Sequence, residues 1–306
     1  MNKIPLEATI TAAYRFLFTR ILSVLGTVWL PIVIMAALVG GIVYAVVPHE
    51  WWQGQFPIAF NEDHPDPAQI LAFARPLFLG LPPLMLISIV MSSMMMVGLL
   101  RLSLGQVRSQ YVFFSLGGDV WRLVLAMLLL VFILVLFYVV CVGVAVAVSM
   151  LLKPFVPHAA WIAVTVVLVI AAVCYPIYAI VRLYFFLPAT IVAQHRIGFG
   201  HSWHLGRGNF WRIILLVLVI VVPVGIVCGM VSNIAVMPIM ASQLMRFQHH
   251  PSPAELGAFF HALVPLFPIM IGVGIVQRIA TTALMAGAAG SAYNALTRKQ
   301  EETKAA

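Results

Sequence analysis

Two groups of side chains in this sequence have residue types suited to metal binding. His201 and His204 stand three residues apart, with His195 nearby, and two His at this spacing share one face of a helix. A tetrahedral zinc site needs a further Cys or carboxylate, which this segment lacks, so contact with lipid phosphates or water is the favoured interpretation. The second group has oxygen ligands that suit a divalent cation, although a solvated loop explains it as well. Its members are His49, Glu50, Glu62, Asp63, His64 and Asp66.

A methionine-rich stretch between residues 85 and 96 offers thioether ligands of the kind that Cu(I) prefers. Three of these methionines are consecutive and therefore point in three directions around a helix, so apolar packing is the favoured interpretation. The sequence contains no Walker loop, dinucleotide-binding glycine pattern, His-Glu-x-x-His or Gly-x-Ser-x-Gly. It therefore predicts a protein that is not an enzyme and that holds no cofactor or metal.

Arg278 stands inside a long apolar stretch, where an unpaired charge is costly and commonly marks a transport path. We expect it to lie near the cytoplasmic rim, with its side chain extending to the aqueous interface. The uncharged intervals 123–152, 159–181 and 213–245 contain no charged residue at all. Ion-coupled transport, which needs a buried carboxylate or His relay, is therefore disfavoured.

Long apolar helices must position these residues, because 63% of the 306 residues are apolar and only 8% are charged. A soluble globular domain is excluded by that composition. Six uncharged intervals reach the length of about 20 residues that a helix needs to cross a bilayer. Period-two alternation is absent, which excludes a membrane β-barrel. We predict an all-α polytopic integral membrane protein with a single membrane domain over residues 1–306.

The predicted domain has six transmembrane helices and two flanking cytoplasmic segments. Residues 1–22 should form an amphipathic interfacial helix with Ile10, Tyr14, Phe18 and Ile21 near one stripe. Residues 285–306 should form a cytoplasmic tail. The spans are expected at about 24–47, 77–100, 123–150, 160–182, 212–236 and 260–284.

Orientation follows from the Lys and Arg residues in the connecting segments. If the N-terminus is inside, fourteen of the 17 basic residues fall on the cytoplasmic side, and only Arg75, Lys153 and Arg246 fall outside. Both termini are therefore predicted to be cytoplasmic, with the protein in a bacterial inner (plasma) membrane. The net charge of +8 is explained by this asymmetry and indicates affinity for anionic headgroups, with no nucleic acid as partner. No cleavable signal peptide is expected.

An internal repeat is suggested by two segments 90 residues apart. Residues 118–122 read Gly-Asp-Val-Trp-Arg and residues 208–212 read Gly-Asn-Phe-Trp-Arg, each with a residue suited to capping a helix, then Trp and Arg for the membrane interface. Pro31 and Pro223 each stand eleven residues after an Arg, so they should kink two helices at the same depth, and Pro176 should kink a third. We predict three tandem two-helix hairpin units. The alternative is that Trp-Arg is common at any membrane interface.

The stretch His201-Ser202-Trp203-His204-Leu205-Gly206-Arg207-Gly208-Asn209-Phe210-Trp211-Arg212 resembles a signature of bacterial six-helix membrane proteins. These are grouped with the membrane domain found beside glycerophosphodiester phosphodiesterases. The segments 182–188 and 292–294 resemble the same family. The resemblance implies six spans, an internal N-terminus and hairpin repetition along nearly the full chain. Hydrolysis in that family belongs to a separate catalytic barrel, for which these residues leave no room, and His204 departs from the usual apolar or hydroxyl residue.

Two functional hypotheses follow. The leading one is a non-catalytic multi-pass protein that engages membrane lipids, including anionic ones, or a membrane or cytoplasmic protein partner through a basic cytoplasmic face. The alternative is a transporter or channel-like protein for an apolar or lipid-like solute, which would need a cavity between the repeats lined by Ser, Asn233 and Gln277. The residues predicted to contact lipid or a partner are Trp121, Arg122, Arg207, Asn209, Trp211 and Arg212.

Overall fold

The computed structural model describes residues 3–49, 67–107, 113–152, 157–244, 262 and 264–305, and within these residues all regular structure is helical. Continuous apolar sequence rich in good helix formers, with every backbone group bonded inside its own segment, explains this. The elements are α1 (Leu6–Thr19), α2 (Ile21–Val46), α4 (Pro67–Ser103), α5 (Gly118–Leu152), α6 (His158–Tyr184), α7 (Leu187–Gln194), α8 (Phe199–Gly206), α9 (Phe210–Leu244), η1 (Val264–Leu266) and α11 (Phe267–Ala305).

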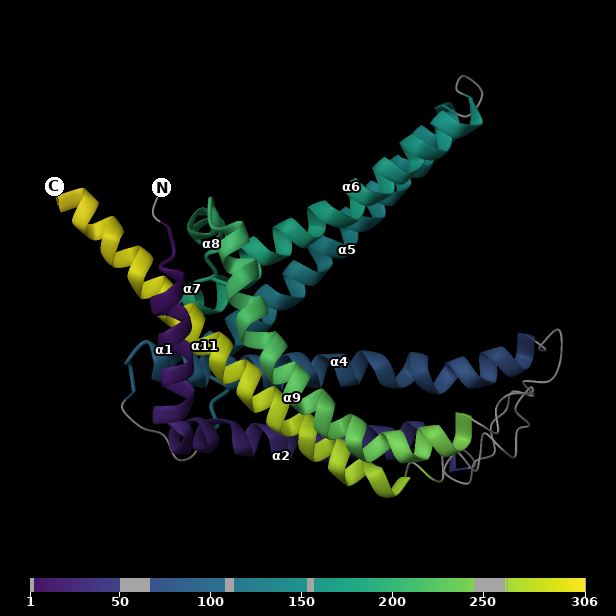
Figure 1. Cartoon of the computed structure of the whole chain (residues 1–306), viewed down its shortest axis with the longest axis horizontal. Coiled ribbons are helices and arrows are strands. Elements are labelled where there is room, and N and C mark those ends of the chain that lie inside the picture. The colour runs from purple at the N-terminus through teal and green to yellow at the C-terminus, as the bar shows by residue number, and fades with distance from the viewer. Residues whose placement is uncertain are drawn as a thin grey trace.

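Six of these helices, α2, α4, α5, α6, α9 and α11, are long and apolar enough to cross a membrane. The predicted all-α polytopic architecture is therefore confirmed, and the chain is a multi-pass membrane protein. Consecutive spans pack against each other as α2 with α4, α5 with α6, and α9 with α11. These pairs are the three predicted hairpin units (Figure 1), whereas their origin by duplication stays a prediction.

Side-chain packing is concentrated at one end of the molecule, which we call the packed end. It comprises the starts of α2, α5 and α9, the ends of α4 and α6, the later half of α11, and the short helices α1, α7 and α8. Nearly all buried side chains belong to these segments. The opposite halves of the six spans expose large apolar residues, and Figure 1 shows the α5–α6 hairpin leaving the other helices at a wide angle. We call the divergence between α4 and this hairpin the fork.

The last span departs from the prediction. We expected it to end at residue 284 and a tail to follow, but α11 continues to Ala305, and residues between Ala283 and Leu296 are among the most buried in the chain. The cause is a run of Ala and Gly that lets neighbouring helices approach closely. At Gly287, for example, a Cβ would lie 3.2 Å from Cα of Ala13 in α1.

The N-terminal segment is helical, and one face of this helix packs against neighbouring helices. Helix α1 packs against α11 and α9, with Thr9 and Ala13 buried and the Tyr14 hydroxyl donating to the carbonyl of Val219 at 3.1 Å. Phe18, which we placed on the apolar stripe, is 68% exposed. The exposed Phe18 ring can therefore contact lipid.

Helix α7 was not predicted as a separate element, although it fills the centre of the packed end. Its residues Leu187 to Val192 are buried, and it contacts α4, α5 and α11. It ends at His195, whose left-handed backbone (φ 52°) turns the chain towards α8. Hydropathy cannot distinguish this buried helix from the preceding span, because both are apolar throughout.

Candidate functional site

The first predicted contact segment, residues 118–122, contains a buried carboxylate. Asp119 is 3% exposed and accepts hydrogen bonds from Arg101 Nη2 at 2.7 Å and Arg122 Nη1 at 3.0 Å. His195 Nδ1 lies 2.9 Å from the same carboxylate. We expected Asp119 to cap its own helix, but it bonds these side chains instead. The network joins α4, α5 and the end of α7 at the packed end.

The second predicted segment, residues 208–212, connects the N-terminus to α9 through hydrogen bonds. Asn209 is buried, accepts a hydrogen bond from the amide of Ile4 at 3.0 Å, and donates to the carbonyl of Leu205 at 3.2 Å. Arg212 Nη1 donates to the carbonyl of Ile4. Gly208 has a φ of 76°, a conformation that other residues rarely adopt. The side chains of Asn209 and Arg212 thus bind the backbone of Ile4 and fix the N-terminal segment in place.

A stacked arginine lies beside this segment. Arg182, at the end of α6, is 5% exposed, and its guanidinium carbon lies 3.8 Å from the centre of the Trp203 ring. It also donates to the Tyr178 hydroxyl at 2.8 Å and to the Trp203 carbonyl at 3.0 Å. Cation–π contact of an Arg with two aromatic rings stabilises the local packing. The Ser-Trp part of the signature therefore joins α8 to α6, a contact that sequence reasoning missed.

Three of the predicted contact residues remain open to the surroundings. Arg207 is exposed, and the rings of Trp121 and Trp211 are 53% and 77% exposed. Exposed Trp at the ends of apolar spans is typical of the headgroup region. Together with the half-exposed Arg122, these residues can face lipid, whereas the buried Asn209 cannot.

A basic pocket opens between α1 and the end of α4, with a volume of about 370 Å³. Arg15 and Arg20 line it together with Thr19 and Ser103. Arg20 Nη1 donates to the carbonyl of Leu102 at 3.1 Å, which holds this guanidinium against α4. The two guanidinium groups form a donor set suited to a phosphate, whereas the Thr19 and Ser103 hydroxyls donate to backbone carbonyls. The sequence placed both arginines on the cytoplasmic side but gave no reason to bring them together with Ser103.

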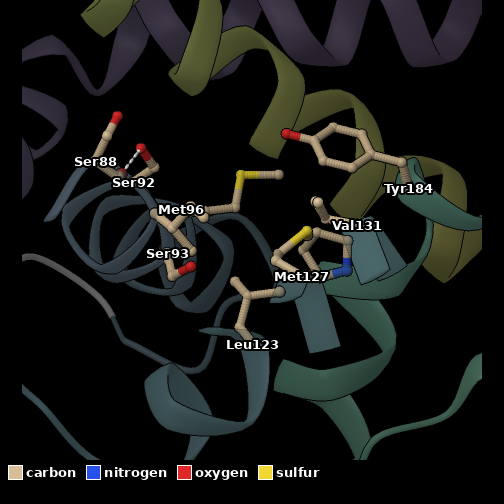
Figure 2. Close-up of a pocket in the computed structure, with 10 residues that line it drawn as sticks. Ser88, Ser92, Ser93, Met96, Leu123, Met127, Val131 and Tyr184 are labelled. Carbon is tan, nitrogen blue, oxygen red and sulfur yellow. Dashed lines mark hydrogen bonds between the residues drawn. The ribbon is translucent and has the colours of Figure 1, made fainter. Parts of the chain in front are cut away.

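A second pocket, of about 250 Å³, lies where the α5–α6 hairpin leaves α4. Figure 2 shows three serines of α4, among them Ser92, on one side and Tyr184 on the other, with the tyrosine hydroxyl directed across the space. Ser92 Oγ donates to the carbonyl of Ser88. The remaining lining residues are Ile89, Met96, Leu123, Met127, Val131 and Pro188. We call it the fork pocket.

Arg278 of α11 reaches this region from behind the serines. Its Nη2 donates to Ser92 Oγ, while its Nε is buried and has no hydrogen-bond partner. The hydroxyl of Ser103, at the end of α4, donates to the carbonyl of Ala286 in α11. Arg278 precedes Ala286 by eight residues, so it lies about 12 Å along α11 from this contact. Ser92 lies eleven residues before Ser103, about 16 Å along α4 from it. The side chain thus points away from the end of α4 and bonds Ser92, whereas our expectation that it lies near the cytoplasmic rim stays a prediction.

Other candidate residues are dispersed or lie outside the described residues. His201 is half-buried beside Tyr293, whereas His204 is exposed. All but the first member of the acidic group, His49, belong to residues 50–66, which the structure does not describe. The predicted kink residues Pro31, Pro176 and Pro223 stand inside continuous helices.

Comparison of the chain with family models, with curated proteins and with solved structures finds no match. The class of protein rests on the fold itself, which is that of a multi-pass α-helical membrane protein.

Proposed function

We propose that this protein engages anionic membrane lipids through its packed end, which faces the cytoplasm of a bacterial inner membrane. The observation that supports this most directly is the segregation of charge. Basic side chains of α1, α5 and α9, of the segments flanking α8 and of the ends of α4 and α6 gather at the packed end, where the described acidic side chains are Glu7 and Asp119. A cationic rim of this kind attracts anionic headgroups.

The basic pocket is the best-defined position for such a headgroup. A phosphate between Arg15 and Arg20 would accept charge-assisted hydrogen bonds from both guanidinium groups. The Arg20 guanidinium is already oriented by its hydrogen bond to the carbonyl of Leu102. Acyl chains would continue along Phe18 and Leu22, which are 68% and 73% exposed. The volume of about 370 Å³ accommodates a headgroup but leaves the chains outside, where the surrounding lipid receives them.

The test is the double variant Arg15→Gln with Arg20→Gln, purified in mild detergent and titrated with vesicles of phosphatidylglycerol in phosphatidylcholine. At about 1 kcal/mol for each basic residue near an anionic surface, affinity should fall about thirtyfold, and wild-type binding should weaken with added salt. Arg75→Gln, an exposed arginine at the opposite end, is the matched control and should bind like wild type. Equal binding by the double variant and wild type would refute the proposal.

A second candidate function, exchange of a lipid-like solute between leaflets, is favoured by the fork and its serine-lined pocket. The expected lining by Asn233 and Gln277 is replaced here by serines of α4 and by Tyr184. Vesicles containing the protein should then accelerate transbilayer movement of a fluorescent phospholipid. No acceleration over protein-free vesicles would remove this candidate.

A further inference from the structure

Among the residues that the structure describes, Arg278 has no charged partner. The described acidic side chains, Glu7 and Asp119, form no ion pair with it, and its Nε is buried without a hydrogen-bond acceptor. Arg278 stands inside the candidate span Phe267–Arg298, about 12 Å along α11 from the residue that contacts the end of α4. A cation inside a membrane span is costly unless an anion or several acceptors compensate it.

The hydroxyl groups around it cannot supply that compensation. Ser92 Oγ accepts one hydrogen bond from Arg278 Nη2 and donates its own proton to the carbonyl of Ser88. The hydroxyls of Ser88, Ser93 and Tyr184, which line the same pocket, form no hydrogen bond to any described residue. The lining of the fork pocket therefore offers several unused hydroxyl donors and no negatively charged acceptor, and the Arg278 guanidinium lies behind Ser92, outside the lining itself.

From this arrangement we propose that the fork pocket binds the anionic headgroup of a membrane amphiphile, with Arg278 as the counter-charge. The headgroup would displace the neutral acceptor Ser92 or bridge to it, and would accept from Ser93 and Tyr184. This donor set, one guanidinium with hydroxyl groups, suits a phosphate monoester or diester. It shares no lining residue with the basic pocket and does not depend on lipid binding there.

The size of the pocket determines what the occupant must look like. A volume of about 250 Å³ is below the range of about 300–1,000 Å³ that encloses drug-sized ligands, so only a headgroup fits. The chains would extend into the fork, where α5 exposes Phe132 (62%) and Val135 (56%) and α4 exposes Met85 (61%). An apolar path that leads from lipid to a polar pocket distinguishes an amphiphile from a free anion, which would have to cross hydrocarbon.

The experiment is photo-crosslinking of the full chain in phosphatidylcholine vesicles that contain diazirine-tagged phosphatidic acid, with the labelled peptides mapped by mass spectrometry. Wild type should be labelled on α5 near Leu123 to Val131, and Arg278→Gln should lower that labelling at least about tenfold, which corresponds to about 1.4 kcal/mol. Arg278→Lys keeps the charge and should retain most of the labelling. Arg75→Gln, a cation outside the fork, should match wild type.

Two further arms keep the proposal testable if Arg278→Gln does not fold. Ser93→Ala with Tyr184→Phe removes two unused donors without changing the charge and should lower labelling about tenfold, at roughly 1 kcal/mol or less for each hydrogen bond. Inorganic phosphate added in large excess should leave labelling unchanged. Labelling that persists in both variants would overturn the proposal, and so would labelling that phosphate abolishes. The Arg15 and Arg20 double variant should lose binding at the packed end but keep labelling in the fork, so failure of one proposal is distinguishable from failure of the other.

Discussion

The glycine at the end of α8 offers the sharpest test of the packing at the signature segment. A Cβ at Gly206 would lie 2.8 Å from the backbone carbonyl oxygen of Arg182 and 3.3 Å from its Cα. The obstacle is helix backbone, which cannot rotate away as a side chain would. Gly206→Ala must therefore push α8 away from α6, and overpacking of this kind costs about 1–3 kcal/mol. The displacement would also lengthen the hydrogen bond from Arg182 to the Trp203 carbonyl.

The same helix contains its own control, because a Cβ at Gly200 would meet nothing within 4 Å. Gly200→Ala should be neutral or stabilise the protein by up to about 1 kcal/mol through helix propensity. We expect the free energies of unfolding of the two variants, measured by far-ultraviolet circular dichroism during titration with dodecyl sulfate, to differ by about 1–4 kcal/mol. Equal stability of the two variants would show that α8 does not pack against α6 as described.

Three further variants test the polar contacts of the packed end. Asp119→Ala should lower the free energy of unfolding by about 1–3 kcal/mol. The loss is smaller than for a fully buried ion pair because the partners of Asp119 are 26–60% exposed. A loss below about 0.5 kcal/mol would contradict a stabilising role for this network. Arg182→Lys should cost about 2 kcal/mol in the same titration, because Lys lacks the planar group that stacks on Trp203, and a neutral result would discount the stack. Burial lowers the pKa of His201 below its usual 6.5, and the charges of His204 and Arg196 lower it further. Below that pH the unfolded chain therefore binds a proton that the folded chain does not. Stability should therefore fall as pH drops below about 6.5, and His201→Gln should remove that part of the loss in melting curves against pH; identical pH profiles would contradict the assignment.

The spans were predictable because charged residues are rare enough to mark where each apolar run begins and ends. Helix α5, for instance, was expected over 123–150 and is a candidate span over Gly118–Leu151. The end of the last span was not predictable by the same reasoning. The run from Ala283 to Ala292 is small and weakly apolar, so it resembles a tail, yet small size is what allows α1 and α4 to pack against it.

The candidate sites were less predictable than the spans, for a physical reason. Hydropathy shows that a residue lies in lipid but not which neighbour it meets, because lipid chains and helix faces are equally apolar. The sequence placed Arg278 in a span and Ser92 in another, but only the packing of α11 on α4 brings them into contact. Likewise, Asp119 and His195 are 76 residues apart, and no periodicity links them.

The distribution of glycines indicates why packing is confined to one end. At the packed end, a Cβ on Gly98, Gly206, Gly287 or Gly290 would collide with or closely approach a neighbouring helix. In the splayed halves of the spans, glycines of α5, α9 and α11 have nothing within 4 Å. Large Val, Leu and Ile side chains predominate there, and in a membrane they gain little by leaving lipid for one another. Polar ties such as Asp119 with Arg101 also occur at the packed end, where they oppose separation of the helices. The fork is therefore expected where the close-packed glycines and polar ties stop, and Arg278 lies near that boundary.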